Sequence, residues 1–465
     1  MYNIKLFLKF SYGTIIGFLL SFVITVLATR FFSPEVYGVL TLYTIIVTLS
    51  MVFITLGTDN AFVRFFNKYS FDDRKALLRA VLKGPLLFFA FIACISLVLY
   101  RPISFALIGS YDLAVVFLLI LTVLSDLLFR FSLLVLRMQK KATMYSIVQI
   151  AHKMVYLVIM LFLFWVFGDT YGAILMSFSF SISIACALAI IADYKFWTQS
   201  NSTSSIDSVE IFKYSIPFMI SSTMTVLNEN TDKLLIKVFL SNSELGIYSA
   251  GFKLVSVLSI FQGMIATILV PLFYEHYEKE ESDKRYYKDA FNLVSLIMIL
   301  IAIGFIFFKD ILIFLLGSEY REVVSIIPFF VFGPLMYTVS ETTVIGINFM
   351  KKSHYHIFIA LGVLLISSLS NLILIPLLGL IGSGISYALA SVSFFVLRSL
   401  FAFKSYKIKY NYGRFFILTT FLVLYLLYMN NRSIDYITTL VTLFFIVTTL
   451  GLYKTDITNM LKKIF

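Results

Sequence analysis

The chain has 465 residues, of which 60% are hydrophobic and only 13% are charged, and its mean hydropathy is +0.95. Soluble domains carry about 25% charged residues, so this composition excludes an ordinary soluble protein and indicates one embedded in a membrane. The formal net charge is +12. The excess cations lie mainly in the loops on one side of the predicted spans, so the charge reflects membrane topology and does not indicate a nucleic-acid-binding surface.

Apolar stretches long enough to cross a bilayer occur fourteen times, at about 20 residues for each span. They leave almost no room for a soluble domain, so the sequence predicts an all-α integral membrane protein. The first stretch is too long for a signal peptide and has no small-residue cleavage site, so we expect it to stay as a helix. The fourteen predicted spans centre near Leu20, Leu49, Phe91, Leu124, Ile159, Ile182, Leu227, Ile260, Ile299, Phe332, Leu365, Ser391, Val423 and Phe444.

The cations gather in alternate loops. If the N-terminus is inside, most of them, from Lys5 and Lys9 to Lys462 and Lys463, fall on the inner side. The positive-inside rule then predicts that both termini are cytoplasmic. The few cations that fall on the outer side are Arg30, Arg101, Lys309, Arg321 and Arg432.

Two halves of the chain resemble each other. The pattern FFSPEVYGVLTL, which starts at Phe31, parallels FLSNSELGIYSAG, which starts at Phe239, and the polar run QSNSTSSIDS between the halves indicates a linker. An even number of spans separates the repeats, which predicts a pseudo-two-fold axis along the membrane normal and a central site between the halves. We therefore predict a six-helix bundle over 1–194, a cytoplasmic linker over 195–212, a second six-helix bundle over 213–403, and two extra helices with a cytoplasmic tail over 404–465.

The seventh predicted span carries four ionisable residues within Ser221–Leu240. An Asp or Lys at the centre of a bilayer costs about 2.5–3.5 kcal/mol on insertion scales. On a helical wheel the polar residues of this span share one broad face and the apolar residues share the other. We interpret this helix as a wall of an internal aqueous cavity.

Further ionisable residues fall in other spans, where they are functional candidates because an unpaired charge in hydrocarbon is expensive. Asp126 and Arg130, like Glu229 and Lys233, have the i,i+4 spacing of a structural ion pair, which leaves a structural and a functional interpretation open for each. Arg64 and Arg398 are both close enough to inner helix ends to snorkel. These residues are Asp59 and Arg64 in the second span, Asp126 and Arg130 in the fourth, Lys153 in the fifth, Lys253 in the eighth, Glu341 in the tenth and Arg398 in the twelfth.

Lys153, Lys237 and Lys253 have no acid three or four residues away on their own helices. Their counter-charge must come from another helix or from a ligand, and a diphosphate binds Lys and Arg well. The cations that we predict to line the cavity and bind such a headgroup are Lys153, Lys233, Lys237, Lys253 and Arg64. The candidates for coupling to H⁺ or Na⁺ are Asp59, Asp232 and Glu341, which alternatively only neutralise neighbouring lysines.

The sequence gives little support for a catalytic site or a metal site. Cys94 and Cys186 both fall in predicted spans, and the four histidines show no convincing metal-ligand spacing. The sequence has no Gly-rich phosphate loop and no nucleophile elbow. We therefore expect no catalytic residue, no metal and no cofactor apart from a coupling ion.

Several short motifs together resemble the Wzx-type polysaccharide flippases, which share a superfamily with the MATE exporters and the lipid II flippase MurJ. They are ATRFFSPEVYG from Ala28, LGTDNA from Leu56, LGSEY from Leu316, and the set Asn371, Pro376 and Gly379 before Gly382. The resemblance covers essentially the whole chain. It implies translocation of an undecaprenyl-pyrophosphate-linked oligosaccharide, such as an O-antigen unit of lipopolysaccharide, across the bacterial inner membrane. It also implies two six-helix bundles that alternate access, with polysaccharide polymerase and chain-length regulator proteins as candidate partners.

Two other functions stay open at this stage. A MATE-like exporter of organic cations would need an acidic lining, and here lysine is prominent. An integral-membrane polysaccharide polymerase or ligase would need a substantial outer loop, and the predicted outer loops are short. We therefore expect a transporter and not an enzyme.

Overall fold

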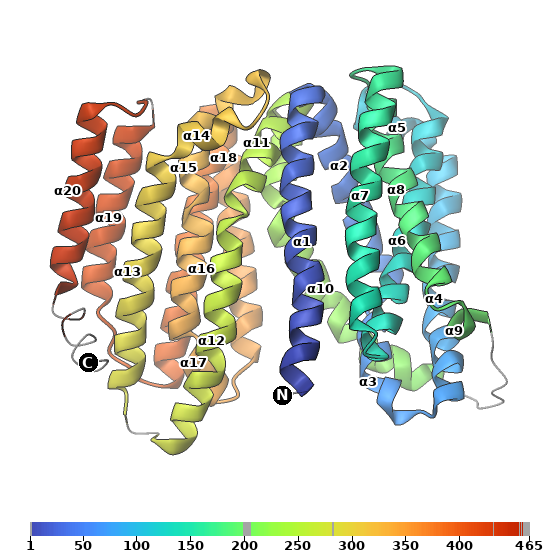
Figure 1. The fold of residues 1–465 in the computed structure, drawn as a ribbon, viewed down its shortest axis with the longest axis horizontal. Coiled ribbons are helices and arrows are strands. Elements are labelled where there is room, and N and C mark those ends of the chain that lie inside the picture. The colour runs from blue at the N-terminus through green and yellow to red at the C-terminus, as the bar shows by residue number, and fades with distance from the viewer. Residues whose placement is uncertain are drawn as a thin grey trace. The chain divides into compact units, whose positions relative to one another are not determined.

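The computed structural model describes residues 2–198, 206–280, 283–430, 432–454, 456 and 458, with side chains from residue 12 onward except those of 71 and 72. Part of the predicted linker 195–212, the end of the predicted tail with Lys462 and Lys463, and the side chains of Lys5 and Lys9 lie outside these described residues. Every regular element in the described part of the chain is a helix (Figure 1), so the predicted all-α fold is confirmed.

The chain divides into two compact units, Met1–Asn230 and Thr231–Phe465. The helices that begin in the first unit are α1 Tyr2–Phe31, α2 Pro34–Thr55, α3 Thr58–Phe65, η1 Phe66–Lys68, α4 Phe71–Val98, α5 Tyr100–Ile108, α6 Leu113–Met138, α7 Ala142–Phe167, α8 Tyr171–Ile191, α9 Tyr194–Thr198 and α10 Ser208–Phe239. Those of the second unit are α11 Asn242–Val255, α12 Leu258–Lys279, α13 Arg285–Phe307, α14 Lys309–Phe314, η2 Ser318–Ser325, α15 Ile327–Phe330, α16 Phe332–Thr343, α17 Ile345–Phe349, α18 His354–Ser405, α19 Tyr412–Met429 and α20 Tyr436–Leu452. The division between the units falls inside α10, shortly after the predicted linker.

All fourteen predicted span centres lie in helices. Ten helices of the described residues are long and apolar enough to cross a membrane, and eleven spans result if the bent pair Ser318–Ser325 and Ile327–Thr343 counts as one. The 52-residue helix α18 counts once among them, although Gly379 (φ 58°, ψ −136°) breaks it between two predicted spans. The charged helix α10 is absent from this set, and α20 is a shorter apolar helix.

The second predicted span ends earlier than expected. Leu56 (φ 50°) and Gly57 (φ 72°) both have left-handed backbone conformations and separate α2 from the short helix α3. A Cβ atom on residue 57 would lie 2.4 Å from the carbonyl oxygen of Ser215, so only glycine fits this turn. Asp59 and Arg64 therefore lie on α3, and the prediction that they belong to the second apolar span was wrong.

The two repeated motifs form the same kind of turn. Ser33 precedes α2 and Ser241 precedes α11, and both have extended backbones at the N-cap position. Each following helix carries an acidic residue in its first turn, Glu35 in α2 and Glu244 in α11. A negative charge there stabilises the helix, because its N-terminus carries a partial positive charge. The repeat seen in the sequence thus encodes one local structure twice.

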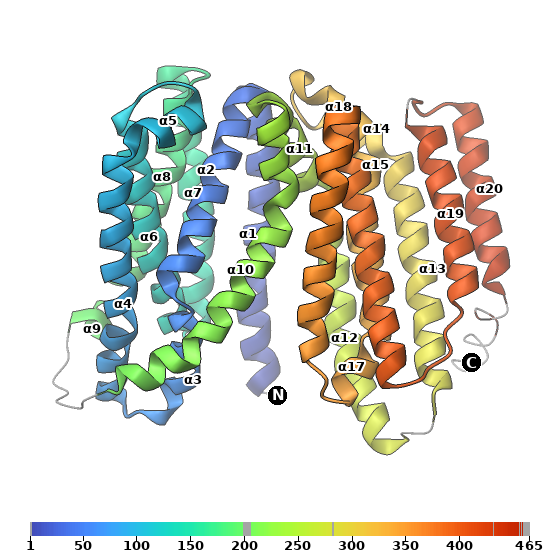
Figure 2. The ribbon, with the colours of Figure 1, turned by 180° about the vertical axis from the view of Figure 1, so that it is seen from behind.

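In the first unit, α6, α7 and α8 pack against one another (Figure 2). Their contact includes Phe129 and Leu136 of α6, Val148 of α7 and Ala185 of α8. Hydroxyl groups also join helices here, since the Tyr43 Oη of α2 lies 2.7 Å from Thr122 Oγ1 and 2.9 Å from Ser179 Oγ. Such small polar contacts hold membrane helices together where lipid provides no hydrophobic driving force.

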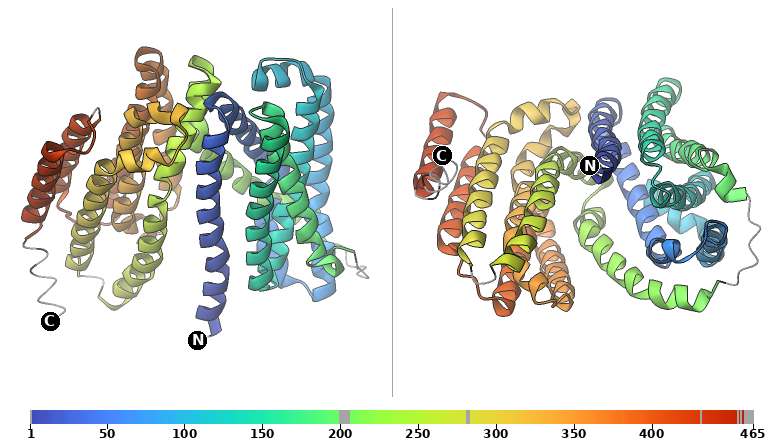
Figure 3. Two further views of the ribbon diagram at one scale, coloured as in Figure 1. Left: turned by 45° about the horizontal axis from the view of Figure 1, so that its top comes forward. Right: turned by 60° about the horizontal axis from the view of Figure 1, so that its bottom comes forward.

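In the second unit, α16 packs against α13 and α18, and the last two helices, α19 and α20, both contact α13 (Figures 1 and 3). A cluster around Phe273, Tyr287, Ile345, Phe349 and Ile408 fills the end of the unit where α12, α13 and α17 approach one another. This cluster fixes the backbone of the segment that joins α18 to α19.

Candidate functional site: charged side chains on membrane helices

The first cluster of membrane charges lies in the N-terminal unit. An Arg130 guanidinium nitrogen lies 3.0 Å from Asp59 Oδ2, so an ion pair joins α6 to α3. The sequence left open whether Asp126 and Arg130 form a structural pair within one helix; the ion pair of Arg130 is with Asp59, while Arg130 also attracts the Asp126 carboxylate. The pair with Asp59 depends on the turn at Leu56 and Gly57, which starts a new helix that contacts α6 and carries Asp59.

Asp126 of α6 still belongs to this cluster, because both Arg130 and Lys153 attract its carboxylate electrostatically. Lys153 is half-buried on α7. The expectation that its counter-charge comes from another helix or a ligand is met in part by Asp126. Arg64 is exposed at the last turn of α3.

Asp232 is the centre of the second cluster, in the C-terminal unit. Its side chain is buried on α10 and accepts three hydrogen bonds from neutral donors. Ser367 Oγ and Asn371 Nδ2 of α18 donate to Oδ1 at 3.0 and 2.5 Å, and Tyr248 Oη of α11 donates to Oδ2 at 3.0 Å. Three donors compensate much of the desolvation cost of this carboxylate. One acidic residue thereby connects three helices.

The predicted lysines of this unit lie around the same helices. The Lys233 ammonium stands 5.3 Å from the centroid of the Phe252 ring, which is a cation–π contact. Lys237 is half-buried on α10. Lys253 is half-buried on α11, and no carboxylate among the described residues forms an ion pair with it. The structure thus brings Asp232, Lys233 and Lys253 to the α10–α11 pair, whereas Lys153 and Arg64 belong to the other unit.

Arg398 and Glu341 form the third cluster. Arg398 Nη1 lies 2.8 Å from Glu341 Oε1 and 2.7 Å from Ser340 Oγ, and both charged side chains are 10% exposed. The rings of Tyr337 and Phe394 cover the guanidinium at 5.2 and 4.9 Å. Arg398 does not snorkel to a helix end as expected, because Glu341 of α16 supplies a counter-charge within the bundle.

Sequence reasoning missed the neutral partners in these clusters. Tyr248, Ser367 and Asn371 surround Asp232, and only Asn371 stood in a motif that the sequence singled out. Residues of this kind are abundant in the chain, and no local spacing connects them to Asp232, since 135 residues separate it from Ser367.

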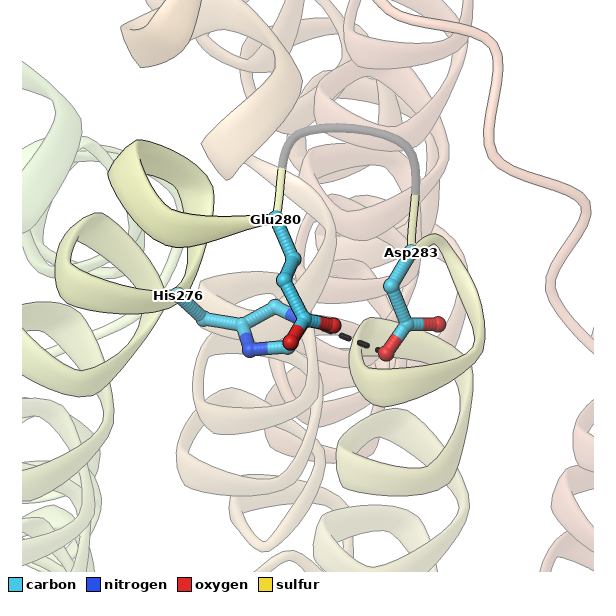
Figure 4. A group of neighbouring side chains, drawn as sticks. All are labelled: His276, Glu280 and Asp283. Atoms are coloured by element: carbon cyan, nitrogen blue, oxygen red, sulfur yellow. Dashed lines mark ion pairs between the residues drawn. The ribbon is translucent and has the colours of Figure 1, made fainter.

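A group with metal-ligand chemistry lies in the connection between α12 and α13 (Figure 4). The ligand atoms of His276, Glu280 and Asp283 all lie within 4.8 Å of one another. His276 Nε2 is 3.2 Å from Asp283 Oδ2, and the imidazole stacks on Tyr286 at 4.1 Å. Asp283 Oδ1 also accepts the Arg285 backbone N–H at 3.0 Å. These contacts hold the turn before α13 together. Sequence reasoning also missed this group, although the i,i+4 spacing of His276 and Glu280 could have pointed to it.

A family model described as "Polysaccharide biosynthesis protein" matches residues 7–276. The chain belongs to this family. A search of the curated proteins gave no significant match.

Solved structures show which fold this polysaccharide biosynthesis protein has. The lipid II flippase MurJ in an inward closed conformation aligns with a TM-score of 0.72 at 16% identity, over 96% of this chain and 99% of MurJ. An inward-facing MATE-family multidrug resistance transporter of the MOP superfamily aligns with a TM-score of 0.62 at 10% identity, over 85% of this chain and 97% of that one. A variant of the Vibrio cholerae MATE transporter VcmN aligns with a TM-score of 0.56 at 14% identity, over 87% of this chain and 97% of the VcmN chain. The chain is therefore a multi-pass membrane protein with the fold of the MOP superfamily.

Proposed function

We propose that this polysaccharide biosynthesis protein is a flippase that moves an undecaprenyl-pyrophosphate-linked oligosaccharide across the cytoplasmic membrane of a bacterium. The family match and the fold shared with a lipid II flippase support a lipid-linked substrate. The observation that carries the proposal is Lys253, a half-buried cation on α11, next to the candidate span α12, without a carboxylate partner in the described part of the chain. A diphosphate supplies the counter-charge that such a lysine needs.

The physical task of the protein is to replace water around the headgroup. A sugar diphosphate loses strong hydrogen bonds when it enters hydrocarbon, and cationic and hydroxyl side chains on the helices compensate that loss. Lys153, Lys233, Lys237, Lys253 and Arg64 are the proposed cations, while the prenyl chain stays in the lipid. No bond is made or broken, so the two halves need only alternate access. The termini face the cytoplasm in this proposal, and polymerase and chain-length regulator proteins take up the product.

Complementation tests this function directly. A bacterial strain that lacks its own oligosaccharide flippase and accumulates lipid-linked repeat units should regain surface glycan when it expresses this protein. Because surface glycan requires delivery to the outer leaflet, its return distinguishes a flippase from a MATE-like exporter of small molecules. Drug resistance without surface glycan, in cells that contain the protein in the membrane, would favour the exporter instead.

Among the three acidic candidates for ion coupling, we propose Asp232. Arg130 and Arg398 form ion pairs with Asp59 and Glu341. The hydrogen bonds to Asp232 come instead from the neutral donors Tyr248, Ser367 and Asn371, and Lys233 attracts its carboxylate electrostatically. Its surroundings also offer the hydroxyl and amide oxygens that hard cations prefer.

Asp232→Asn should remove the dependence of transport on a Na⁺ or H⁺ gradient, because the amide keeps the size of the side chain but not its charge. Flipping of a lipid-linked oligosaccharide in proteoliposomes, with and without each gradient, measures this dependence. The matched control is Asp169→Asn, which changes an acidic residue that accepts the Ser33 backbone N–H at 3.1 Å in an exposed hydrogen bond. A variant that folds and retains full gradient dependence would show that Asp232 serves only to join its three helices.

A further inference from the structure

Five cations surround one pocket in the C-terminal unit, and none of them is among the lysines assigned above. The pocket has a volume of about 360 Å³ and is lined by Lys284, Arg285, Lys288, Lys407, Ile408 and Lys409. Lys284 precedes α13, and the 407–409 segment joins α18 to α19. Both segments stand at the ends of helices that are long and apolar enough to cross the membrane. The pocket therefore lies at the level where membrane helices meet water.

The segment 407–410, which joins α18 to α19, exposes Lys407 and Lys409 on the same side of the chain. Residues 407–410 have no helical structure, and side chains of an extended chain alternate between its two sides. Ile408 is 2% exposed in the cluster with Phe273 and Tyr287, and Tyr410 Oη donates to the Thr342 carbonyl oxygen at 3.0 Å. Because Ile408 and Tyr410 are held inward, Lys407 and Lys409 are both exposed on the other side.

The other three cations stand at the start of α13. The N-terminus of a helix carries a partial positive charge, so Lys284, Arg285 and Lys288 are placed where cations are least favourable. Among the described residues, no carboxylate forms an ion pair with any of the five pocket cations. Asp283, adjacent to Lys284 in the sequence, contacts His276 Nε2 through Oδ2 at 3.2 Å. Asp289, adjacent to Lys288, forms no ion pair with a pocket cation in the described part of the chain. The Lys284 ammonium is 4.9 Å from the centroid of the Tyr406 ring, which carries no net charge.

An anion would remove this mutual repulsion. Phosphate groups match the need, since Lys and Arg bind them with charge-assisted hydrogen bonds. At the membrane surface the most abundant phosphate is that of anionic lipids, and basic pockets between membrane helices bind such headgroups. From these observations we infer that the pocket of Lys284, Arg285, Lys288, Lys407 and Lys409 binds the phosphate headgroup of an anionic phospholipid. This site is independent of what the protein transports.

The test uses the full-length protein in nanodiscs of phosphatidylcholine that contain a minor fraction of cardiolipin or phosphatidylglycerol. Native mass spectrometry counts the anionic lipid retained by the wild type, by Lys407→Gln/Lys409→Gln and by Lys284→Gln/Lys288→Gln. Since the two pairs lie on different segments, at least one folded variant tests the site. Each is expected to lower the affinity for anionic lipid about tenfold to thirtyfold. Lys407→Arg/Lys409→Arg should retain it.

The control, Lys351→Gln/Lys352→Gln, removes two cations between α17 and α18 that do not line the pocket and should retain the lipid. Equal retention by the wild type and a folded pocket variant would overturn the inference. A second arm adds millimolar inorganic phosphate to protein in neutral nanodiscs. Tight phosphate binding there, or displacement of lipid by phosphate, would overturn the lipid assignment in favour of a free anion.

Discussion

Lys253→Ala should lower glycan export by about tenfold to a hundredfold while the protein stays at normal abundance in the membrane. A charge-assisted hydrogen bond contributes about 1.5–3 kcal/mol, and the described residues offer Lys253 no carboxylate that could take the place of a substrate phosphate. Surface glycan in the complemented strain measures export, and Lys253→Arg should retain most of it. Normal export by Lys253→Ala would remove this residue from the proposed lining.

Lys153→Ala should reduce export to a similar extent. Because Asp126 attracts this lysine, the loss of a substrate contact must be distinguished from the loss of a counter-charge for Asp126. If Lys153 only neutralises Asp126, then the double variant Asp126→Asn/Lys153→Ala restores export, because it leaves no unpaired carboxylate. If Lys153 binds the headgroup, the double variant stays defective. A quantitative immunoblot of membranes excludes loss of protein as the explanation.

Arg398→Met should lower the free energy of unfolding by about 3–5 kcal/mol, because it leaves the Glu341 carboxylate buried without its counter-charge. The 10% exposure of both side chains and the 2.8 Å distance between them make this the most buried charge pair between helices in the described part of the chain. Thermal unfolding of the purified protein in detergent measures the change.

The second variant, Arg398→Met/Glu341→Gln, should recover most of this loss, since replacing both partners of a buried pair removes the uncompensated charge. Lys279→Met is the comparison, because it breaks the exposed i,i+4 pair with Glu275 and should leave stability unchanged. Equal effects of Arg398→Met and Lys279→Met would show that the buried pair contributes no more than a surface pair.

The sequence predicted the fold well because hydropathy and charge distribution are properties of single segments. Every predicted span centre lies in a helix, and the Ser33 and Ser241 turns have the common geometry that their motifs indicated. The helix break at Leu56 and Gly57 was harder to predict, because it depends on how closely the turn approaches Ser215, a residue far along the chain.

Charge pairing was predicted least well, for a physical reason. Sequence spacing shows neighbours on one helix, whereas the partners of Arg130 and Arg398 come from other helices. The result changes which charges are suited to ligand binding: Arg398 has a fixed counter-charge, but Lys253 has none among the described residues. The assignment of the lysines to a substrate headgroup stays a prediction until the variants are measured.

Gly57 has a consequence for how this sequence can drift during evolution. The left-handed turn and the 2.4 Å approach to the Ser215 carbonyl leave no room for any side chain. Neighbours such as Leu56 can be exchanged for residues that tolerate the turn, but position 57 has only one acceptable amino acid. Descendants of this gene that keep the α2–α3 corner must therefore keep this glycine, even where the surrounding apolar residues have been replaced many times.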